Sequence, residues 1–171
     1  MNARITLVLA IAFQGFALIG MYVNAAIPLW TGQEIRVATI PVDPRSLFRG
    51  NYAQLRYAFD VIRSAELDSD EVLRNGEVVY VLLEKQADGT YAFSGASLAR
   101  PDGAVALRGR VTDHFIDENE EAFYGIHYGI DAFFAPKERA LALEQELRDG
   151  GIAVLMVAAD GRARIKDILG Q

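Results

Sequence analysis

The sequence contains no cysteine, and only two histidines and three lysines among its 171 residues. Without cysteine there is no disulfide scaffold, iron–sulfur cluster, thiolate zinc site or cysteine nucleophile. The histidines, His114 and His127, are thirteen residues apart, which matches no metal-ligand spacing. Gly-rich phosphate loops, Gly-x-Ser-x-Gly elbows and Walker-type sequences are also missing. We therefore expect no metal and no cofactor.

Positive charge is also scarce. The chain has 17 Lys and Arg against 23 Asp and Glu, which gives a net charge of −6. It has no basic field to neutralise phosphates, so we expect no nucleic-acid partner. Apolar residues make up 51% and charged residues 23%, which excludes a disordered chain. The length allows one folded domain plus a short appendage.

Charge is absent altogether from Ile5 to Ile27. At about 1.5 Å per residue this run would form a helix of roughly 34 Å, enough to cross a hydrocarbon core of about 30 Å. Trp30 follows, where aromatic side chains favour the membrane interface, and Pro28 is expected to stop the helix. We predict a transmembrane anchor over residues 1–30 and a folded domain over residues 31–171.

Two other interpretations of this segment are open. A secretory signal could be cleaved at Val23-Asn24-Ala25, but the apolar run exceeds the roughly 7 to 15 residues of such a signal. A buried helix of a soluble core is disfavoured because the run has no polar stripe to face solvent. The positive charges near the two ends do not decide the orientation. A short N-terminal tail before an apolar run is how an export signal is built, so we expect the domain outside the cytoplasm.

Beyond Trp30 the sequence changes to short runs rich in β-branched and aromatic residues, divided by turn signals. Asp88-Gly89 and Asp160-Gly161 are the strongest hairpin signals, because alternating runs flank both of them. The predicted strands are Glu34–Ile40, Tyr52–Ile62, Glu77–Glu84, Thr90–Ser94, Ala104–Val111, Ala122–Gly129, Ile152–Ala158 and Arg162–Ile168.

One helix is predicted from Pro136 to Gly150-Gly151, with Leu143 and Leu147 on its apolar face. The stretch from Ser64 to Arg74 fits a second helix and a structured loop equally well. Seven or eight strands with one helix predict a mainly β (α+β) fold. We expect an antiparallel barrel-like or sandwich-like sheet with the helix packed across it.

The most unusual segment runs from Pro41 to Tyr57. Its two prolines restrict the preceding residues to extended or turn geometry, and Gly50-Asn51 offers a tight turn. The residues that follow are expected to form a strand, with Leu55 and Tyr57 on one face.

The segment from Gly50 to Tyr57 resembles the motif of the GDYXXLXY family of bacterial membrane-anchored proteins. It fits seven of the eight motif positions, and Asn51 stands where the family has Asp, which removes a carboxylate. Further resemblance lies in Val42-Asp43-Pro44-Arg45, Leu47-Phe48-Arg49, Phe133-Phe134-Ala135-Pro136 and Asp160-Gly161-Arg162-Ala163. The resemblance implies a place in the bacterial inner membrane and a multi-pass membrane protein as partner, but no established activity.

The motif supplies the candidate interaction residues. The charged residues before Gly50 could form an ion pair that clamps the loop, or a recognition patch for a partner. Tyr52 and Tyr57 are more typical of core or sheet-face aromatics than of binding platforms. The candidate residues are Asp43, Arg45, Arg49, Gly50, Asn51, Tyr52, Leu55 and Tyr57.

These observations favour an accessory or interaction module on the membrane. One alternative is an extracytoplasmic small-ligand or glycan binder that uses the barrel mouth. Another is an envelope hydrolase, for which Ser46 and Lys85 would be the nucleophile and base, although no lysine has an apolar context that would depress its pKa.

The acidic run from Asp117 to Glu121 lacks the central glycine of a calcium loop, so we expect a solvated loop there.

Overall fold

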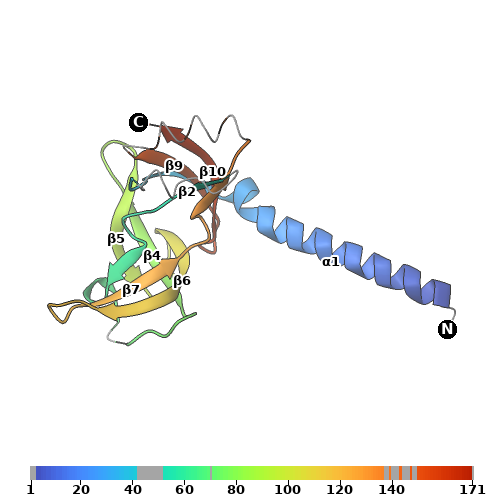
Figure 1. Ribbon diagram of the computed structural model, residues 1–171, viewed down its shortest axis with the longest axis horizontal. Coiled ribbons are helices and arrows are strands. Elements are labelled where there is room, and N and C mark those ends of the chain that lie inside the picture. The colour runs from blue at the N-terminus through green and yellow to red at the C-terminus, as the bar shows by residue number, and fades with distance from the viewer. Residues whose placement is uncertain are drawn as a thin grey trace.

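The computed structural model describes residues 3–41, 52–69, 71–136, 139, 143, 147 and 150–170. A long helix, α1 (Ala3–Thr31), projects from a β-rich domain, as Figure 1 shows. Most of α1 is exposed, and only Ala26 and Pro28 are buried against the domain. Pro28 lies inside the helix, so the prediction that it stops the helix is wrong.

The domain is built on a curled eight-stranded sheet with the order β10-β9-β1-β5-β4-β6-β7-β3 (Figure 1). All neighbouring strands are antiparallel except β1 and β5, which are parallel where Val37 pairs with Tyr91. The mainly β, barrel-like fold predicted from the sequence is thus confirmed. The strands of this sheet are β1 (Gln33–Ala38), β3 (Val61–Arg63), β4 (Val78–Lys85), β5 (Tyr91–Ser97), β6 (Val105–Ile116), β7 (Ala122–His127), β9 (Gly151–Val157) and β10 (Ala163–Gly170).

The two strongest hairpin predictions are confirmed. Gly89 has a φ of 85° between β4 and β5, and Gly161 has a φ of 82° between β9 and β10. Glycine adopts this left-handed conformation without the steric cost that other residues meet. Each turn therefore sits where the sequence supplies the residue that it needs.

The turn between β9 and β10 also bends the sheet toward closure. The Arg108 amide on β6 donates to the Gly161 carbonyl at 2.7 Å. A side chain at Gly161 would lie 3.1 Å from the Ala106 carbonyl and from Arg108, so the approach requires glycine. One edge hairpin thereby contacts a strand near the other edge.

The predicted strand Tyr52–Ile62 is divided in two. Its first part, β2 (Tyr52–Gln54), pairs with the unpredicted β8 (Ala132–Phe134) in a small second sheet. Its last part belongs to β3, and a turn over Ala58–Asp60 separates the two. The Asp60 carboxylate accepts the Tyr57 amide at 2.8 Å, while the Asp60 amide donates to the Tyr57 carbonyl at 3.1 Å. These bonds satisfy the backbone in a turn and end the strand.

The stretch from Ser64 to Arg74 is mainly a loop. It begins with one 3-10 turn, η1 (Ser64–Glu66), after which Leu67 forms a parallel bridge with Ala96. The predicted C-terminal helix falls largely outside the described residues. Leu143 and Leu147 are buried, as its apolar face requires.

The core fills the concave side of the curled sheet. It combines alternate residues of the central strands with Ala53, Leu55 and Tyr57, which belong to the segment that we call the motif segment (residues 52–57). Among the described residues, no buried side-chain nitrogen or oxygen atom lacks a hydrogen-bond partner. Its most buried large side chains include Ile35, Ile62, Val79, Val81, Leu107, Tyr124, Leu155 and Ile168.

Candidate functional site

The second half of the family-like motif is anchored in the core. Leu55 and Tyr57 are only 3% and 2% exposed, so the prediction that they share one face is confirmed. The Leu55 amide donates to the Asp131 carbonyl at 2.8 Å, which ties the motif to the segment after β7. Of the other candidates, Tyr52 lies in β2, and Asp43, Arg45, Arg49, Gly50 and Asn51 lie outside the described residues.

Tyr57 connects the motif to a cluster of aromatic rings. Its hydroxyl donates to the buried Ile130 carbonyl at 2.9 Å, and its ring stacks on Phe59 with centroids 5.3 Å apart. Phe59 in turn meets Tyr128 edge to face, and the Tyr128 hydroxyl donates to the Phe59 carbonyl at 2.7 Å. Burial raises the pKa of both tyrosines well above the ordinary value. Both hydroxyls therefore stay protonated at neutral pH, and the expectation that Tyr57 is a core aromatic is confirmed.

A polar hollow of about 220 Å³ opens beside this cluster, and we call it the motif pocket. Besides Tyr57 and Tyr128, its titratable or charged side chains are Arg56, Asp60, His127 and Asp131. Burial is the main reason that the pKa of Asp60 is raised, and the amide of Tyr57 and the charge of Arg56 offset part of that rise. His127 Nδ1 lies 3.6 Å from Asp131 Oδ1, and both side chains are more than half exposed.

The motif pocket offers hydrogen bonding rather than an evident reaction centre. Its threonine, Thr112, directs its hydroxyl to the Gly125 carbonyl at 3.2 Å, and its tyrosine hydroxyls are engaged as described. Lys85 lies exposed at the end of β4 and does not line the pocket, whereas Ser46 falls outside the described residues. Within the described part of the chain, no three His, Asp or Glu side chains are grouped to hold a metal ion.

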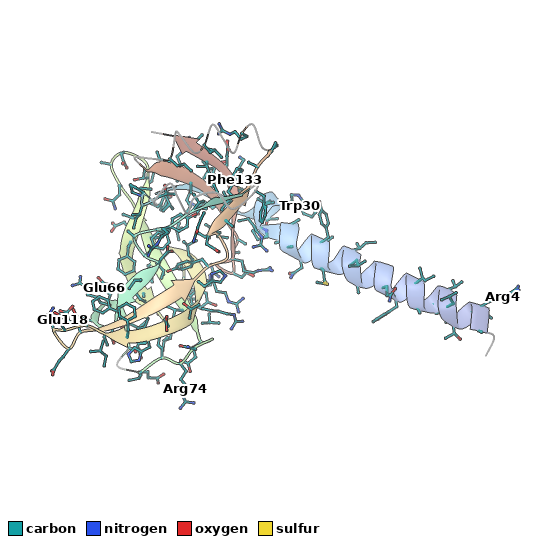
Figure 2. The ribbon with its side chains drawn as sticks, in the orientation of Figure 1. Arg4, Trp30, Glu66, Arg74, Glu118 and Phe133 are labelled. Carbon is teal, nitrogen blue, oxygen red and sulfur yellow. The ribbon has the colours of Figure 1, made fainter. Side chains whose placement is uncertain are left out.

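The acidic run forms the turn between β6 and β7. The Asp117 carboxylate accepts the amides of Glu121 and Asn119 at 2.8 and 2.9 Å, which lowers its pKa. Its ligand oxygens are thus engaged within the loop, and the predicted solvated loop is confirmed. Figure 2 shows Glu118 at the tip of this loop, far from α1.

The junction between α1 and the domain is a second feature of the structure, and its contacts were not predicted from the sequence. Arg162 Nη1 donates to the Asn24 carbonyl at 3.3 Å and to the Asn24 side-chain oxygen at 3.0 Å. Arg164 Nε donates to the Ala25 carbonyl at 3.4 Å. Arg162 immediately precedes β10 and Arg164 lies in its first turn-side residues, so the hairpin of β9 and β10 contacts the base of the helix.

The base of α1 also passes into β1 without a linker. The Gly32 amide donates to the Pro28 carbonyl at 2.9 Å, and β1 begins at the next residue. A side chain at Gly32 would collide with that carbonyl and lie 3.0 Å from the Val157 backbone. Trp30 lies at this end of α1 and Arg4 at the other, as Figure 2 shows. The contacts hold helix and domain in a defined relationship.

The helix itself carries a shallow apolar groove of about 280 Å³. Its walls include Phe16, Val23 and Ile27, and Gly20 lies at its floor. A Cβ atom at Gly20 would meet nothing within 4 Å, so the notch is open. Such a surface can admit the close approach of another helix.

Comparison with known proteins gives one match. A family model described as GDYXXLXY protein matches residues 14–168, which covers most of the chain and reaches from the middle of α1 into β10. No curated protein and no solved structure matches the chain.

Proposed function

The chain belongs to the GDYXXLXY family, and from this premise we propose that it is a membrane-anchored accessory module that binds a multi-pass membrane protein. The location that goes with this proposal is the bacterial inner membrane, with the β domain on its outer side. The observation that carries the proposal is the exposed apolar helix α1. It is long and apolar enough to cross a membrane, and its most apolar stretch has no residue buried against the domain.

The exposed apolar side chains of α1 must be shielded from water by lipid or by another protein. Phe13 and Phe16 are 76% and 82% exposed, and apolar side chains follow on every face of the helix. A continuous apolar surface of this kind is not stable in water, and it is typical of a segment that meets lipid or another protein. The helix therefore supports an anchor better than it supports a soluble element.

The hydrogen-bonded junction supports a role in binding a membrane partner. Because Arg162 and Gly32 fix the base of α1, the domain would sit at one height and angle above the membrane. A partner with several spans could then contact α1 within the bilayer and the motif pocket outside it. Two contacts on one rigid body bind more tightly than either alone when their geometry matches.

The groove at Gly20 supplies a test of this proposal. The full chain would be expressed with an affinity tag in bacterial membranes, washed with high salt, solubilised in mild detergent and purified with its partners for mass spectrometry. Salt should not release the chain, since apolar burial and not surface charge retains it. A multi-pass membrane protein should co-purify.

Gly20→Leu and Gly15→Leu form a matched pair of variants. Both glycines face open space, but only Gly20 lines the groove. We expect Gly20→Leu to reduce the co-purified partner several-fold and Gly15→Leu to leave it unchanged. Release of the intact chain by salt would refute the anchor. Recovery of the chain with no membrane protein would refute the accessory role.

A further inference from the structure

A second hollow of about 220 Å³ lies between β6, β7 and the turn that joins β9 to β10. We infer that it binds a phosphate-type anion at the membrane surface. We call it the arginine hollow, and its polar lining residues are Arg108, Arg110, His127, Tyr128 and Arg162. No aspartate or glutamate lines it among the described residues.

The fold brings these side chains together from three segments. Arg108 and Arg110 are two residues apart on β6, so they point to the same face of the sheet. His127 on β7 is the register partner of Arg110. Arg162 follows Gly161, whose carbonyl accepts the Arg108 amide at 2.7 Å. The bond between Arg108 and Gly161 therefore also brings Arg162 beside the two arginines of β6.

The arginines are only partly engaged by the protein. Arg110 Nη1 donates to the Gly76 carbonyl at 2.7 Å, while Asp160 Oδ2 lies 2.6 Å from Arg162 Nε. Among the described residues, no carboxylate forms a salt bridge with Arg108 or Arg110. His127 is near Asp131, which lies in the motif pocket and not in this hollow. Two guanidinium groups without counter-ions are thus grouped in a chain whose net charge is −6.

This arrangement suits a tetrahedral oxyanion. A guanidinium group presents parallel N–H donors that match two oxygens of a phosphate, and a second guanidinium group adds donors and a second positive charge. A neutral or cationic ligand would leave the arginine charges uncompensated. The shared chemistry is therefore a phosphate group, either free or at the head of a lipid.

The position of the hollow favours the lipid, and this part of the inference rests on the proposed membrane anchor. Arg162 lines the hollow and also donates to Asn24, which lies near the end of the uncharged run from Ile5 to Ile27. If that run fills the hydrocarbon core, Arg162 sits at the depth of the lipid headgroups. A headgroup phosphate in the hollow would then fix the rotation of the domain about α1.

The test uses the full chain in a neutral-detergent micelle. Binding of short-chain phosphatidylglycerol, short-chain phosphatidylcholine and inorganic phosphate would be titrated separately by calorimetry. We expect phosphatidylglycerol to bind in preference to phosphatidylcholine, because the arginines are not opposed by the choline cation. Binding of inorganic phosphate alone would show that the anion is a free phosphate and would refute the lipid assignment.

The matched variants remove equal charge from two places. Arg108→Gln/Arg110→Gln removes two positive charges from the arginine hollow, while Arg36→Gln/Lys85→Gln removes two positive charges from another surface. The first pair should weaken anion binding by roughly tenfold or more, and the control pair by less than about twofold. Thermal melting of each variant checks that it folds. Equal losses in both pairs, or no anion binding to the wild-type chain, would overturn the inference.

The outcomes also separate this inference from the proposed function. Salt extraction tests the anchor without reference to the hollow. A chain that salt releases, but that still binds phosphate through Arg108 and Arg110, would refute the anchor and keep the anion site. A chain that stays in the membrane but binds no anion would keep the anchor and refute the anion site.

Discussion

Arg162 supplies a hydrogen bond that Pro28 removes from α1. In a regular helix the Asn24 carbonyl accepts the amide of residue 28, but proline has no amide hydrogen. Arg162 Nη1 reaches that carbonyl at 3.3 Å and also bonds the Asn24 side chain. The helix continues to Thr31, and a donor to the carbonyl that Pro28 leaves unbonded comes from the domain. The same carbonyl of Asn24 thus lacks a backbone donor within the helix and receives a side-chain donor from the residue that precedes β10.

This relationship predicts an energetic coupling between Arg162 and Pro28. Arg162→Gln should destabilise the wild-type chain by about 1 kcal/mol, because a carbonyl and a side-chain amide lose a partner. In a Pro28→Ala background the alanine amide can bond the Asn24 carbonyl, so the same substitution should cost less. A double-mutant cycle on denaturant unfolding in mild detergent would measure a coupling of about 0.5 kcal/mol or more. Arg36→Gln in the same two backgrounds is the control, and an equal cost of Arg162→Gln in both would contradict the prediction.

Gly32 is expected to tolerate no side chain. Gly32→Ala would force the Pro28 carbonyl or the Val157 backbone to move, and we expect a loss of about 1 to 3 kcal/mol. Gly20→Ala is the control, since its Cβ would meet nothing within 4 Å. Trp30 is the only tryptophan and lies beside Gly32, so its fluorescence reports the junction directly. Thermal unfolding followed by that signal should shift for Gly32→Ala alone.

The strand pattern of the domain could be predicted because turn residues and apolar alternation agree with each other. Asp88-Gly89 and Asp160-Gly161 mark their hairpins because only glycine meets the required φ at low cost. The error over Tyr52–Ile62 has a physical cause. Ala53, Leu55, Tyr57 and Phe59 are buried at every second position, so the alternation continues through a turn that a single side chain, Asp60, creates.

Tyr57→Phe tests the anchoring of the motif. The substitution leaves the buried Ile130 carbonyl without its donor, and it should lower the free energy of unfolding by about 1 to 2 kcal/mol. Tyr57→Ala should cost about 3 to 5 kcal/mol, since it also empties the space beside Phe59. Tyr91→Phe is the control, because among the described residues its hydroxyl bonds the exposed Gln33 amide alone, at 3.3 Å, and it should stay within about 0.5 kcal/mol. A Tyr57→Phe chain as stable as the wild type would show that this bond does not hold the motif.

The candidate sites could be predicted only in part. The motif segment could be identified because its residue pattern is unusual. The residues that surround it in the pocket could not be predicted, because Asp60, His127 and Asp131 are brought together by a turn and a strand end with no fixed spacing in the sequence. Likewise, Arg162 and Asn24 are 138 positions apart, and nothing local distinguishes an arginine that docks a helix from one that faces solvent.

The last prediction concerns the pH dependence that Asp60 confers. Burial raises the pKa of Asp60 in the folded chain above its ordinary value of 3.8. The folded state therefore takes up this proton at a higher pH than the unfolded state does. The contribution of Asp60 to stability is most favourable below pH 3.8, and it is lost as the pH rises through the folded pKa. At neutral pH the buried carboxylate is a cost that its bond to the Tyr57 amide offsets in part.

Asp60→Asn isolates this contribution. Asparagine keeps an oxygen that can accept the Tyr57 amide but carries no charge, so at neutral pH the variant should be as stable as the wild type or more so. As the pH falls through the folded pKa toward 3.8, the wild type should gain relative to the variant, by about 1 kcal/mol or less since Asp60 keeps some contact with solvent. Denaturant unfolding of both chains at several pH values gives the difference, which cancels the opposite trends of carboxyls such as Asp117 and Asp160, whose pKa values are lowered. Asp131→Asn removes a carboxylate from the same pocket, where its side chain is 57% exposed, and serves as the matched control for the loss of one acidic group. A wild type that loses stability relative to Asp60→Asn on acidification would mean that hydrogen bonding and Arg56, rather than burial, dominate at Asp60.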